Sequence, residues 1–388
     1  MTSGFNSRND VWLSNIVVRL VWLKRVISIA KPVFDHEEFK AVREVLESGW
    51  LMNGPKVREF EEKFAGYCGA KFGIAVNSGT SALHIALLAL GIGPGDEVIT
   101  TPFSFIASAD CIRLVGAKPV FVDIDLRTYN LDVEKIEDAV SDRTKGIVVV
   151  HLYGLCVDMD PVLEVAEKYG LFVVEDAAQA HGGEYKGRKV GSIGHVGCFS
   201  FWPTKNMTTG GGGIIVTSDD EIAERARLLR FNGEVRDYRH ILLGYNLLMP
   251  EIQAAIGLVQ LKKLDGFVEK RRRIARFYNE EFADLDLVLP FEPEYAKHVY
   301  HLYTVRVDAK KRNYILEDLN KEGVQAKVYY PIPIPFQPSY RGFGFVEGSF
   351  PVAEKVAKEV FSLPVHPALS EEDVNFVVEK VKEILRQL

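Results

Sequence analysis

One lysine in this sequence lies where a reactive amine is expected. Lys205 follows the mostly apolar residues 198–204 and precedes four consecutive glycines at 210–213. Most lysines are exposed to water, but these flanks favour burial, and burial lowers the pKa of an amine. A neutral lysine amine can attack an aldehyde and form a Schiff base. A solvated surface lysine is the alternative interpretation.

A carboxylate that could work with this amine follows an apolar run earlier in the chain. Asp176 comes directly after residues 171–175, which read as a buried strand. A carboxylate at the end of such a strand is costly unless it is paired, and a ring nitrogen that it keeps protonated is a suitable partner. Together with Lys205, this predicts pyridoxal 5'-phosphate (PLP), whose protonated ring accepts electrons from a carbanion. The alternative is a helix N-cap.

Other side chains could hold such a cofactor. Residues 78–81 read Ser-Gly-Thr-Ser between a strand and a helix, where free backbone N–H groups and hydroxyls favour an anion. Ser200 adds a hydroxyl near Lys205, Gln179 could donate to a ring oxygen, and Phe105 could stack on a flat ring. An ordinary N-cap and a core aromatic are the alternatives. Three histidines without metal-ligand spacing are interpreted as structural: His151, His181 and His301.

Alternating strands and helices must position these residues. Hydrophobic periodicity predicts strands at 72–76, 97–101, 119–124, 146–152, 171–175, 198–201, 213–217, 300–307 and 324–330. It predicts helices at 36–48, 57–67, 82–90, 106–115, 161–169, 218–232, 251–264, 314–322 and 371–385. This order indicates an α/β fold with a mostly parallel sheet covered on both faces. Ligands bind such sheets at the carboxyl ends of the strands, so the candidate residues are expected to converge there.

Composition limits the classes of partner. The chain has 388 residues and a net charge of −6, which indicates no basic face for nucleic acid. Its four cysteines have no metal-ligand spacing and are interpreted as reduced, in a cytoplasmic protein that binds no metal. Charged residues interrupt the apolar stretch near the N-terminus, which is too short for a membrane span. We expect an extension at 1–25, a large domain at 26–265 and a small domain at 266–388.

Beyond these physical signals, the chain resembles the DegT/DnrJ/StrS family of PLP-dependent nucleotide-sugar aminotransferases. The matching segments occur in the family's order at residues 48–51, 77–83, 175–182, 200–206, 244–246 and 363–367. The resemblance implies fold type I, the aspartate aminotransferase-like fold, with a seven-stranded, mostly parallel sheet and a smaller α+β C-terminal domain. It also implies a homodimer whose active site is shared between subunits.

The resemblance further implies roles for individual residues. Lys205 would hold PLP and then move protons, and Asp176 would pair with the ring nitrogen. Gln179 would contact the ring hydroxyl and Phe105 would stack on the ring. The phosphate would be held by Gly79, Thr80 and Ser200, with Asn246 reaching it from the neighbouring subunit. A lysine at 205 is typical of the aminotransferases, because the dehydratases of the same family carry histidine there.

Several positions depart from the family's usual pattern. Gly211 replaces an acidic residue, Leu248 an arginine, Tyr329 a histidine, and the loop containing Pro335 lacks another histidine. Met52-Asn53 also differs from the usual Thr or Ser followed by Gln. We expect these positions to affect contacts with substrate or with the second subunit, and to leave the PLP residues intact.

These observations predict a transaminase that moves an amino group from glutamate to a nucleotide-linked keto sugar, as in polysaccharide biosynthesis, with pyridoxamine phosphate as the intermediate form. Thr208-Thr209 before the glycines favours amination at C4, whereas Gln179-Ala180-His181 is common among members that aminate C3. The alternatives are a cyclitol aminotransferase, a sugar dehydratase, or a regulatory protein that has kept the fold.

Overall fold

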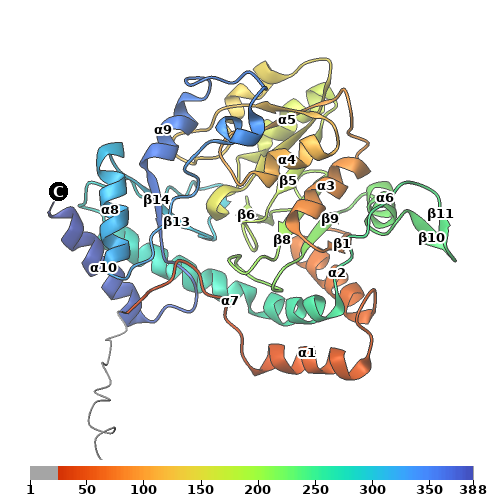
Figure 1. Cartoon of the computed structure of the whole chain (residues 1–388), viewed down its shortest axis with the longest axis horizontal. Coiled ribbons are helices and arrows are strands. Elements are labelled where there is room, and N and C mark those ends of the chain that lie inside the picture. The colour runs from red at the N-terminus through yellow and green to blue at the C-terminus, as the bar shows by residue number, and fades with distance from the viewer. Residues whose placement is uncertain (1–24, 388) are drawn as a thin grey trace, which may run out of the picture.

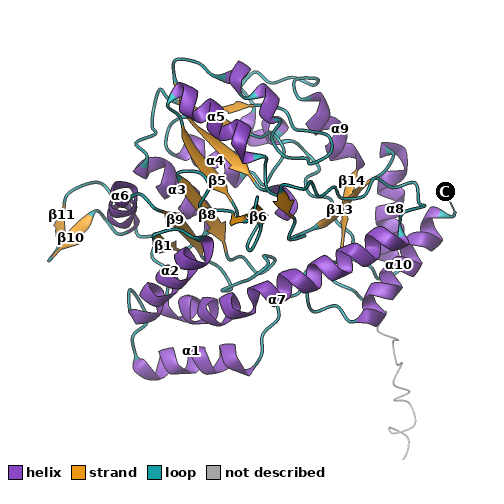
Figure 2. Ribbon diagram, turned by 180° about the vertical axis from the view of Figure 1, so that it is seen from behind, coloured by secondary structure: helices purple, strands orange, loops and turns teal. Residues whose placement is uncertain are grey.

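The core of the molecule is a seven-stranded sheet. A computed structural model describes residues 25–387, and Figures 1 and 2 show it from opposite sides. In spatial order the strands are β1 (Phe72–Val76), β9 (Gly213–Thr217), β8 (Val196–Ser200), β5 (Phe172–Asp176), β4 (Thr144–Val150), β2 (Glu97–Thr100) and β3 (Lys118–Phe121). Only β9 runs against the others. This confirms the mostly parallel sheet.

Helices cover both faces of this sheet. One face packs against α2 (Pro55–Cys68), α5 (Met159–Tyr169) and the first part of α7 (Glu251–Glu281). The other packs against α3 (Gly79–Ala89), α4 (Ala107–Leu114) and α6 (Asp220–Arg230). Adjacent residues of a strand point to opposite faces, so Ile147 and Val149 lie in the first core and Val148 in the second. The sheet is therefore buried on both sides.

A long helix links the sheet to the C-terminal part of the chain. The 31 residues of α7 run from beneath the sheet to the far side of the molecule (Figure 2). There it packs against the antiparallel pair β13 (Tyr303–Arg306) and β14 (Val360–Leu363), with α8 (Ala309–Lys321) and α10 (Glu371–Leu385). The predicted domain boundary at 265 falls inside α7, so one rigid element crosses it. The division into two domains stays a prediction.

Shorter elements complete the described chain. α1 (His36–Ser48) begins with a capping box formed by Asp35 and Glu38, ends at left-handed Gly49, and lies along α7. α9 (Pro351–Glu359) precedes β14. The remaining strands are β6 (Glu184–Tyr185), β7 (Arg188–Lys189), β10 (Glu234–Arg236), β11 (Arg239–His240) and β12 (Ala296–Lys297). Short 3-10 turns are η1 (Val133–Lys135), η2 (Glu137–Ala139), η3 (Leu152–Gly154), η4 (Ile334–Phe336) and η5 (Pro338–Tyr340).

Two sequence predictions about elements need correction. The predicted strand at 324–330 is wrong, because that segment makes only isolated bridges, from Val324 to Ile27 and from Lys327 to Ser362. Its apolar side chains pack in the C-terminal core without a continuous strand partner. The predicted helix at 251–264 continues to Glu281, because the charged stretch that follows keeps a buried stripe including Val268, Ile274 and Tyr278.

The N-terminal prediction concerns residues that mostly lie outside the described part of the chain. Residues 1–24 are not described, whereas Arg25 pairs with Glu372 and Asp373 at the start of α10. Across residues 25–387, none of the helices combines the length and the hydrophobicity needed to cross a membrane.

Candidate active site

The predicted site residues come from strand ends and from the loop that follows them. Asp176 ends β5, Ser200 ends β8, and Lys205 lies five residues further along. β1 ends at Val76, two residues before the N-cap of α3. Because β1, β5 and β8 run in the same direction, these residues share the carboxyl edge of the sheet.

Asp176 is a buried carboxylate with too few partners. Its side chain accepts hydrogen bonds from the Ser108 hydroxyl at 2.7 Å and from the Ala178 N–H at 3.2 Å. Burial raises its pKa, and these bonds, together with the positive charge of Lys205, only partly offset that effect. A cationic group brought to Asp176 would therefore be strongly favoured.

Lys205 is an amine whose charge is disfavoured by its surroundings. Burial lowers its pKa to about 8, against the attraction of Asp176. No hydrogen bond or ion pair of its Nζ is found within residues 25–387. At pH 8 a large fraction of such an amine is uncharged and can act as a nucleophile.

The histidines near Lys205 add no positive charge. His181 is buried against the rings of Phe64, Phe199 and Phe201, and burial lowers its pKa to about 3. Burial also lowers the pKa of His301, and the Lys205 charge acts in the same direction. Both rings are therefore neutral near pH 7 and add no positive charge beside Lys205.

The start of α3 provides an anion-binding geometry. Ser78 is the N-cap and accepts from the Ser81 N–H at 3.1 Å, while Gly79 and Thr80 begin the helix. A helix N-terminus presents backbone N–H groups and a positive dipole end. A Cβ on Gly79 would lie 2.6 Å from the Cβ of Ser200, so only glycine lets α3 approach the end of β8 this closely. The structure thus brings Gly79 and Ser200 together, as predicted.

Gln179 is held at both ends of its amide. Its Oε1 accepts from the Tyr153 N–H at 2.8 Å, and its Nε2 donates to the Tyr330 hydroxyl at 3.1 Å. Phe105 is 55% exposed, and its ring centroid lies 6.4 Å from that of Tyr330. An exposed aromatic beside the buried polar groups is available to stack on a planar ligand.

Comparison with known proteins identifies the chain. Residues 32–382 match the model of the DegT/DnrJ/EryC1/StrS aminotransferase family. The chain belongs to this family.

Relatives of this aminotransferase act on nucleotide sugars. It is 42% identical over 368 residues to GDP-perosamine synthase from Caulobacter vibrioides, an alignment that covers 92% of this chain and 98% of the relative. It is 41% identical over 337 residues to UDP-2-acetamido-2-deoxy-3-oxo-D-glucuronate aminotransferase from Pseudomonas aeruginosa, covering 87% and 92%. The crystal structure of S. venezuelae DesV in complex with a ketimine intermediate aligns with TM-score 0.89 and 39% identity, covering 93% of this chain and 100% of DesV.

These findings confirm fold type I and a PLP-dependent sugar aminotransferase. The residues present also fit the cofactor on physical grounds. Asp176 lacks the cationic partner that a ring nitrogen would supply, Lys205 has the lowered pKa that carbonyl chemistry needs, and the start of α3 suits a phosphate. When bound, PLP supplies the electron sink for transamination.

Asn246 is the one predicted site residue that the described chain does not bring to the others. It is exposed, and its backbone bridges to Phe231. Within residues 25–387, no hydrogen bond joins its side chain to Lys205 or Asp176. That Asn246 reaches the site of a second subunit stays a prediction.

Three partners of the site were not predicted from the sequence. Ser108 donates to Asp176, and Tyr153 and Tyr330 hold Gln179. Ser108 follows Phe105 on the next helix and could have been noticed as a hydroxyl close to a strand end. Nothing in the local sequence indicates the two tyrosines, because they lie 26 residues before and 151 residues after Gln179.

Two departures from the family pattern have a clear setting in this aminotransferase. A Cβ on Gly211 would lie 3.3 Å from the Nε2 of Gln253, so a side chain there would press on α7 unless Gln253 moved. The carbonyl of Tyr329 accepts a hydrogen bond from the Tyr153 hydroxyl. The region around 329 is therefore joined through its backbone to residues near the candidate site. Nothing described explains Leu248 or Met52-Asn53.

Proposed function

We propose that this enzyme transfers the amino group of glutamate to a nucleotide-linked keto sugar, with Lys205 as the residue that binds PLP and moves protons. The observation that carries this proposal is the pairing of an under-satisfied buried carboxylate, Asp176, with an amine whose pKa is lowered to about 8. The two groups match the ring nitrogen and the aldehyde of PLP, and membership of a sugar aminotransferase family supports the class of reaction.

Each site residue has a proposed task. Asp176 keeps the ring nitrogen protonated, and Gln179 donates through Nε2 to the ring oxygen. Gly79, Thr80 and Ser200 hold the phosphate, and Phe105 stacks on the ring. Lys205 accepts the proton from the α-carbon of glutamate and later returns one to the sugar carbon, because a neutral amine of lowered pKa is a competent general base.

For the sugar, we propose amination at C4, based on Thr208-Thr209 ahead of the glycine run. Thr208 donates to the Phe201 carbonyl at 2.8 Å and accepts from the Gly210 N–H at 2.9 Å, so it shapes the backbone after Lys205. Amination at C3 is the alternative, since two relatives are named for a 3-oxo or 3-dehydro sugar.

A panel assay tests both points. The PLP-loaded enzyme receives glutamate with nucleotide-linked 4-keto or 3-keto sugars, and 2-oxoglutarate release is measured. NMR of the product then assigns the aminated carbon. Release with a 4-keto sugar supports the proposal, and release with 3-keto sugars alone transfers it to C3. No release with any sugar would favour the cyclitol aminotransferase or the dehydratase.

We also propose a homodimer in which Asn246 completes the site of the partner. The β10–β11 hairpin projects from the edge of the molecule in both views (Figures 1 and 2). Large apolar side chains are exposed on or next to it: Val235, Tyr238, Ile241 and Leu243. Such a patch is typical of a protein interface. Asn246 follows it in the chain and would come with it.

Subunit mixing tests the shared site. Lys205→Ala and Asn246→Ala homodimers are expected to be inactive, whereas exchange between them should restore about a quarter of wild-type activity, because half of the dimers are mixed and each holds one intact site. Absence of recovery after exchange, verified with tagged subunits, would place Asn246 outside the partner's site. For the cellular compartment, we propose the cytoplasm. All four cysteines are free thiols, which suits a reducing environment.

A further inference from the structure

Tyr153 is a buried tyrosine in an unusual backbone conformation beside the site. It follows β4 within η3 and is 3% exposed, with φ 57° and ψ 4°. A left-handed conformation costs a non-glycine residue on the order of 1 kcal/mol and is found mostly where the surroundings require it. Here it accompanies a specific contact, because the Tyr153 N–H donates to Oε1 of Gln179 at 2.8 Å.

The other end of Tyr153 reaches the C-terminal part of the chain. Its hydroxyl donates to the carbonyl of Tyr329. The next residue, Tyr330, places its hydroxyl 3.1 Å from Nε2 of Gln179. The contacts therefore form a closed ring that leaves Gln179 through Oε1, passes through Tyr153 and the 329–330 backbone, and returns to Nε2. We call this the Tyr153–Gln179–Tyr330 network.

The network fixes which way the Gln179 amide points. Oε1 can only accept a hydrogen bond and Nε2 can only donate. If the amide were flipped, Nε2 would face the Tyr153 N–H, which is also a donor, and a buried donor would lose its partner. The observed orientation is thus strongly preferred. Nε2 has a second N–H, which is free to donate to another acceptor.

We infer that Tyr153 is a positioning residue: through its N–H and its hydroxyl it holds Gln179 and Tyr330 so that Nε2 presents a fixed donor to the ring oxygen of the cofactor. This inference rests on the proposed placement of Gln179 beside that oxygen. It also couples the 329–330 segment, where the chain departs from the family pattern, to the cofactor-binding residues.

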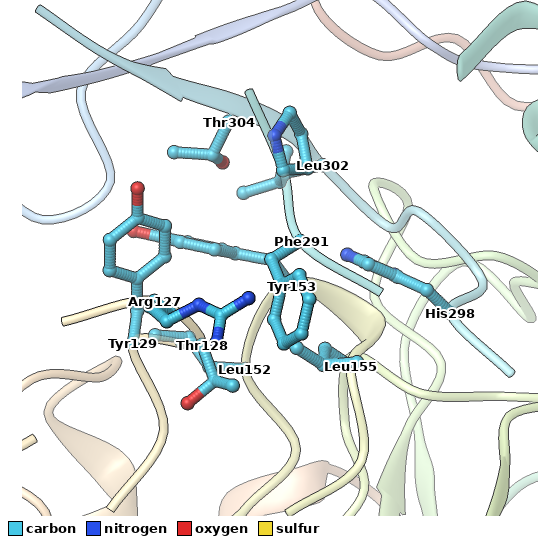
Figure 3. Close-up of a pocket in the computed structure, with 11 residues that line it drawn as sticks. Arg127, Thr128, Tyr129, Leu152, Tyr153, Leu155, Phe291, His298, Leu302 and Thr304 are labelled. Carbon is cyan, nitrogen blue, oxygen red and sulfur yellow. The ribbon is translucent and has the colours of Figure 1, made fainter. Parts of the chain in front are cut away.

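Tyr129 offers a matched comparison. It is 4% exposed, it has φ 60°, and its ring lies 6.1 Å from that of Tyr153. Both tyrosines line the same small pocket, which Figure 3 shows and which Lys205 and Asp176 do not line. The Tyr129 hydroxyl, however, interacts with Arg306 and not with the network. Removing this hydroxyl with Tyr129→Phe should therefore reproduce the packing effects of Tyr153→Phe without disturbing Gln179.

The test is an absorbance titration of the PLP-loaded protein without glutamate or sugar. A donor at the ring oxygen competes with the Schiff-base proton of Lys205 for the negative charge on that oxygen. Loss of the fixed donor should therefore raise the pH at which the visible band titrates, by about one unit, as expected for one hydrogen bond to a charged group. Gln179→Leu, which removes the donor completely, gives the largest shift expected. Tyr153→Phe and Tyr330→Phe should each show a substantial part of it, and Tyr129→Phe none.

The outcomes separate the inference from the function on which it rests. If Gln179→Leu leaves the titration unchanged, the proposed placement of Gln179 is wrong. If Gln179→Leu shifts it but Tyr153→Phe does not, Tyr153 is merely structural and the inference is overturned. Tyr330→Phe serves if Tyr153→Phe fails to fold, since an unshifted midpoint there would equally contradict the network. In the double variant, the shifts of Tyr153→Phe and Tyr330→Phe should not add, because both act through one amide.

Discussion

Glu175 and Asp176 are adjacent carboxylates at the end of β5, yet the regions around them differ in hydrogen bonding. Glu175 is fully buried and accepts from the backbone N–H groups of Gly191, Ile193 and Gly194, each at 2.7 Å. Its Oε2 also lies 2.9 Å from Nε2 of His151. Asp176, whose side chain points to the opposite face of the sheet, has one hydroxyl and one N–H.

The difference in partners reverses the effect of burial on the two carboxyls. Burial raises the pKa of both, but for Glu175 the His151 and backbone hydrogen bonds outweigh it, and its pKa lies below the usual value. For Asp176 burial prevails and the pKa is raised. A carboxylate whose hydrogen-bonding capacity is filled by protein groups stabilises the fold, whereas one with unfilled capacity is available to a ligand.

The largest expected effect tests the amine that faces Asp176. Lys205→Ala should abolish the visible absorption band of the PLP-loaded protein and lower turnover on the order of 10³-fold or more, because the attacking amine and the proton carrier are lost together. Lys145→Ala, an exposed lysine on β4, is the control and should change neither. Retention of the band in Lys205→Ala would show that a different lysine binds the cofactor.

The next effect separates the two carboxylates directly. Asp176→Asn should lower turnover by about 10²-fold or more, because the ring nitrogen loses its charged partner, and should leave the unloaded fold at least as stable. Glu175→Gln should lower the free energy of unfolding by about 3 kcal/mol, because it disturbs a buried set of charge-assisted bonds. Denaturant unfolding and turnover per folded molecule measure the two effects. Similar results for both variants would show that the two carboxyls do not differ in role.

A smaller effect concerns how stability depends on pH in the unloaded protein. The folded pKa of Glu175 lies below its unfolded value of about 4.3, so its contribution is present above that value and is lost as the pH falls toward the folded pKa. Asp176 has the opposite sign: its charge destabilises the fold as the pH rises through its raised pKa.

Thermal unfolding between pH 3 and pH 8 compares these contributions. Glu175→Gln should lose less stability on acidification than wild type. Asp176→Asn should be more stable than wild type at pH 7, with the difference vanishing toward pH 4. If both variants show the same dependence of thermal stability on pH as the wild type, neither carboxyl governs the sensitivity of the fold to acid.

The smallest expected effect is on the pH at which Lys205 becomes reactive. In the unloaded protein its acylation rate should reach half its maximum near pH 8. Asp176→Asn should move the Lys205 midpoint to lower pH, because the carboxylate charge favours the protonated amine. Peptide mass spectrometry after brief labelling at several pH values gives both midpoints. An unshifted midpoint would mean that Asp176 does not act on Lys205.

Much of the architecture follows from local patterns. The helix at 36–48 and the strands at 72–76 and 213–217 agree with the prediction because each has a clear periodicity and clear end signals, such as the Asp35 capping box and Gly49. The strand predicted at 324–330 did not form, because a strand needs a partner along its length and the local sequence does not contain that information. Conversely, the β14 strand was not predicted, because the local sequence does not show that residues 360–363 pair with β13.

The sequence by itself determined which residues could do the chemistry: a lysine with apolar and glycine flanks, a carboxylate after a buried strand, and a Ser-Gly-Thr-Ser turn. It did not determine that Glu175 would have a full set of hydrogen-bond partners and Asp176 too few. Nor did it determine that Tyr153 and Tyr330 would hold Gln179. Those outcomes depend on segments that are distant in the chain, such as 191–194 and 329–330, meeting β5 and its loop. Residue type sets what a group can do, whereas desolvation and hydrogen bonding set which group is left free to do it, and both arise only when the chain is folded.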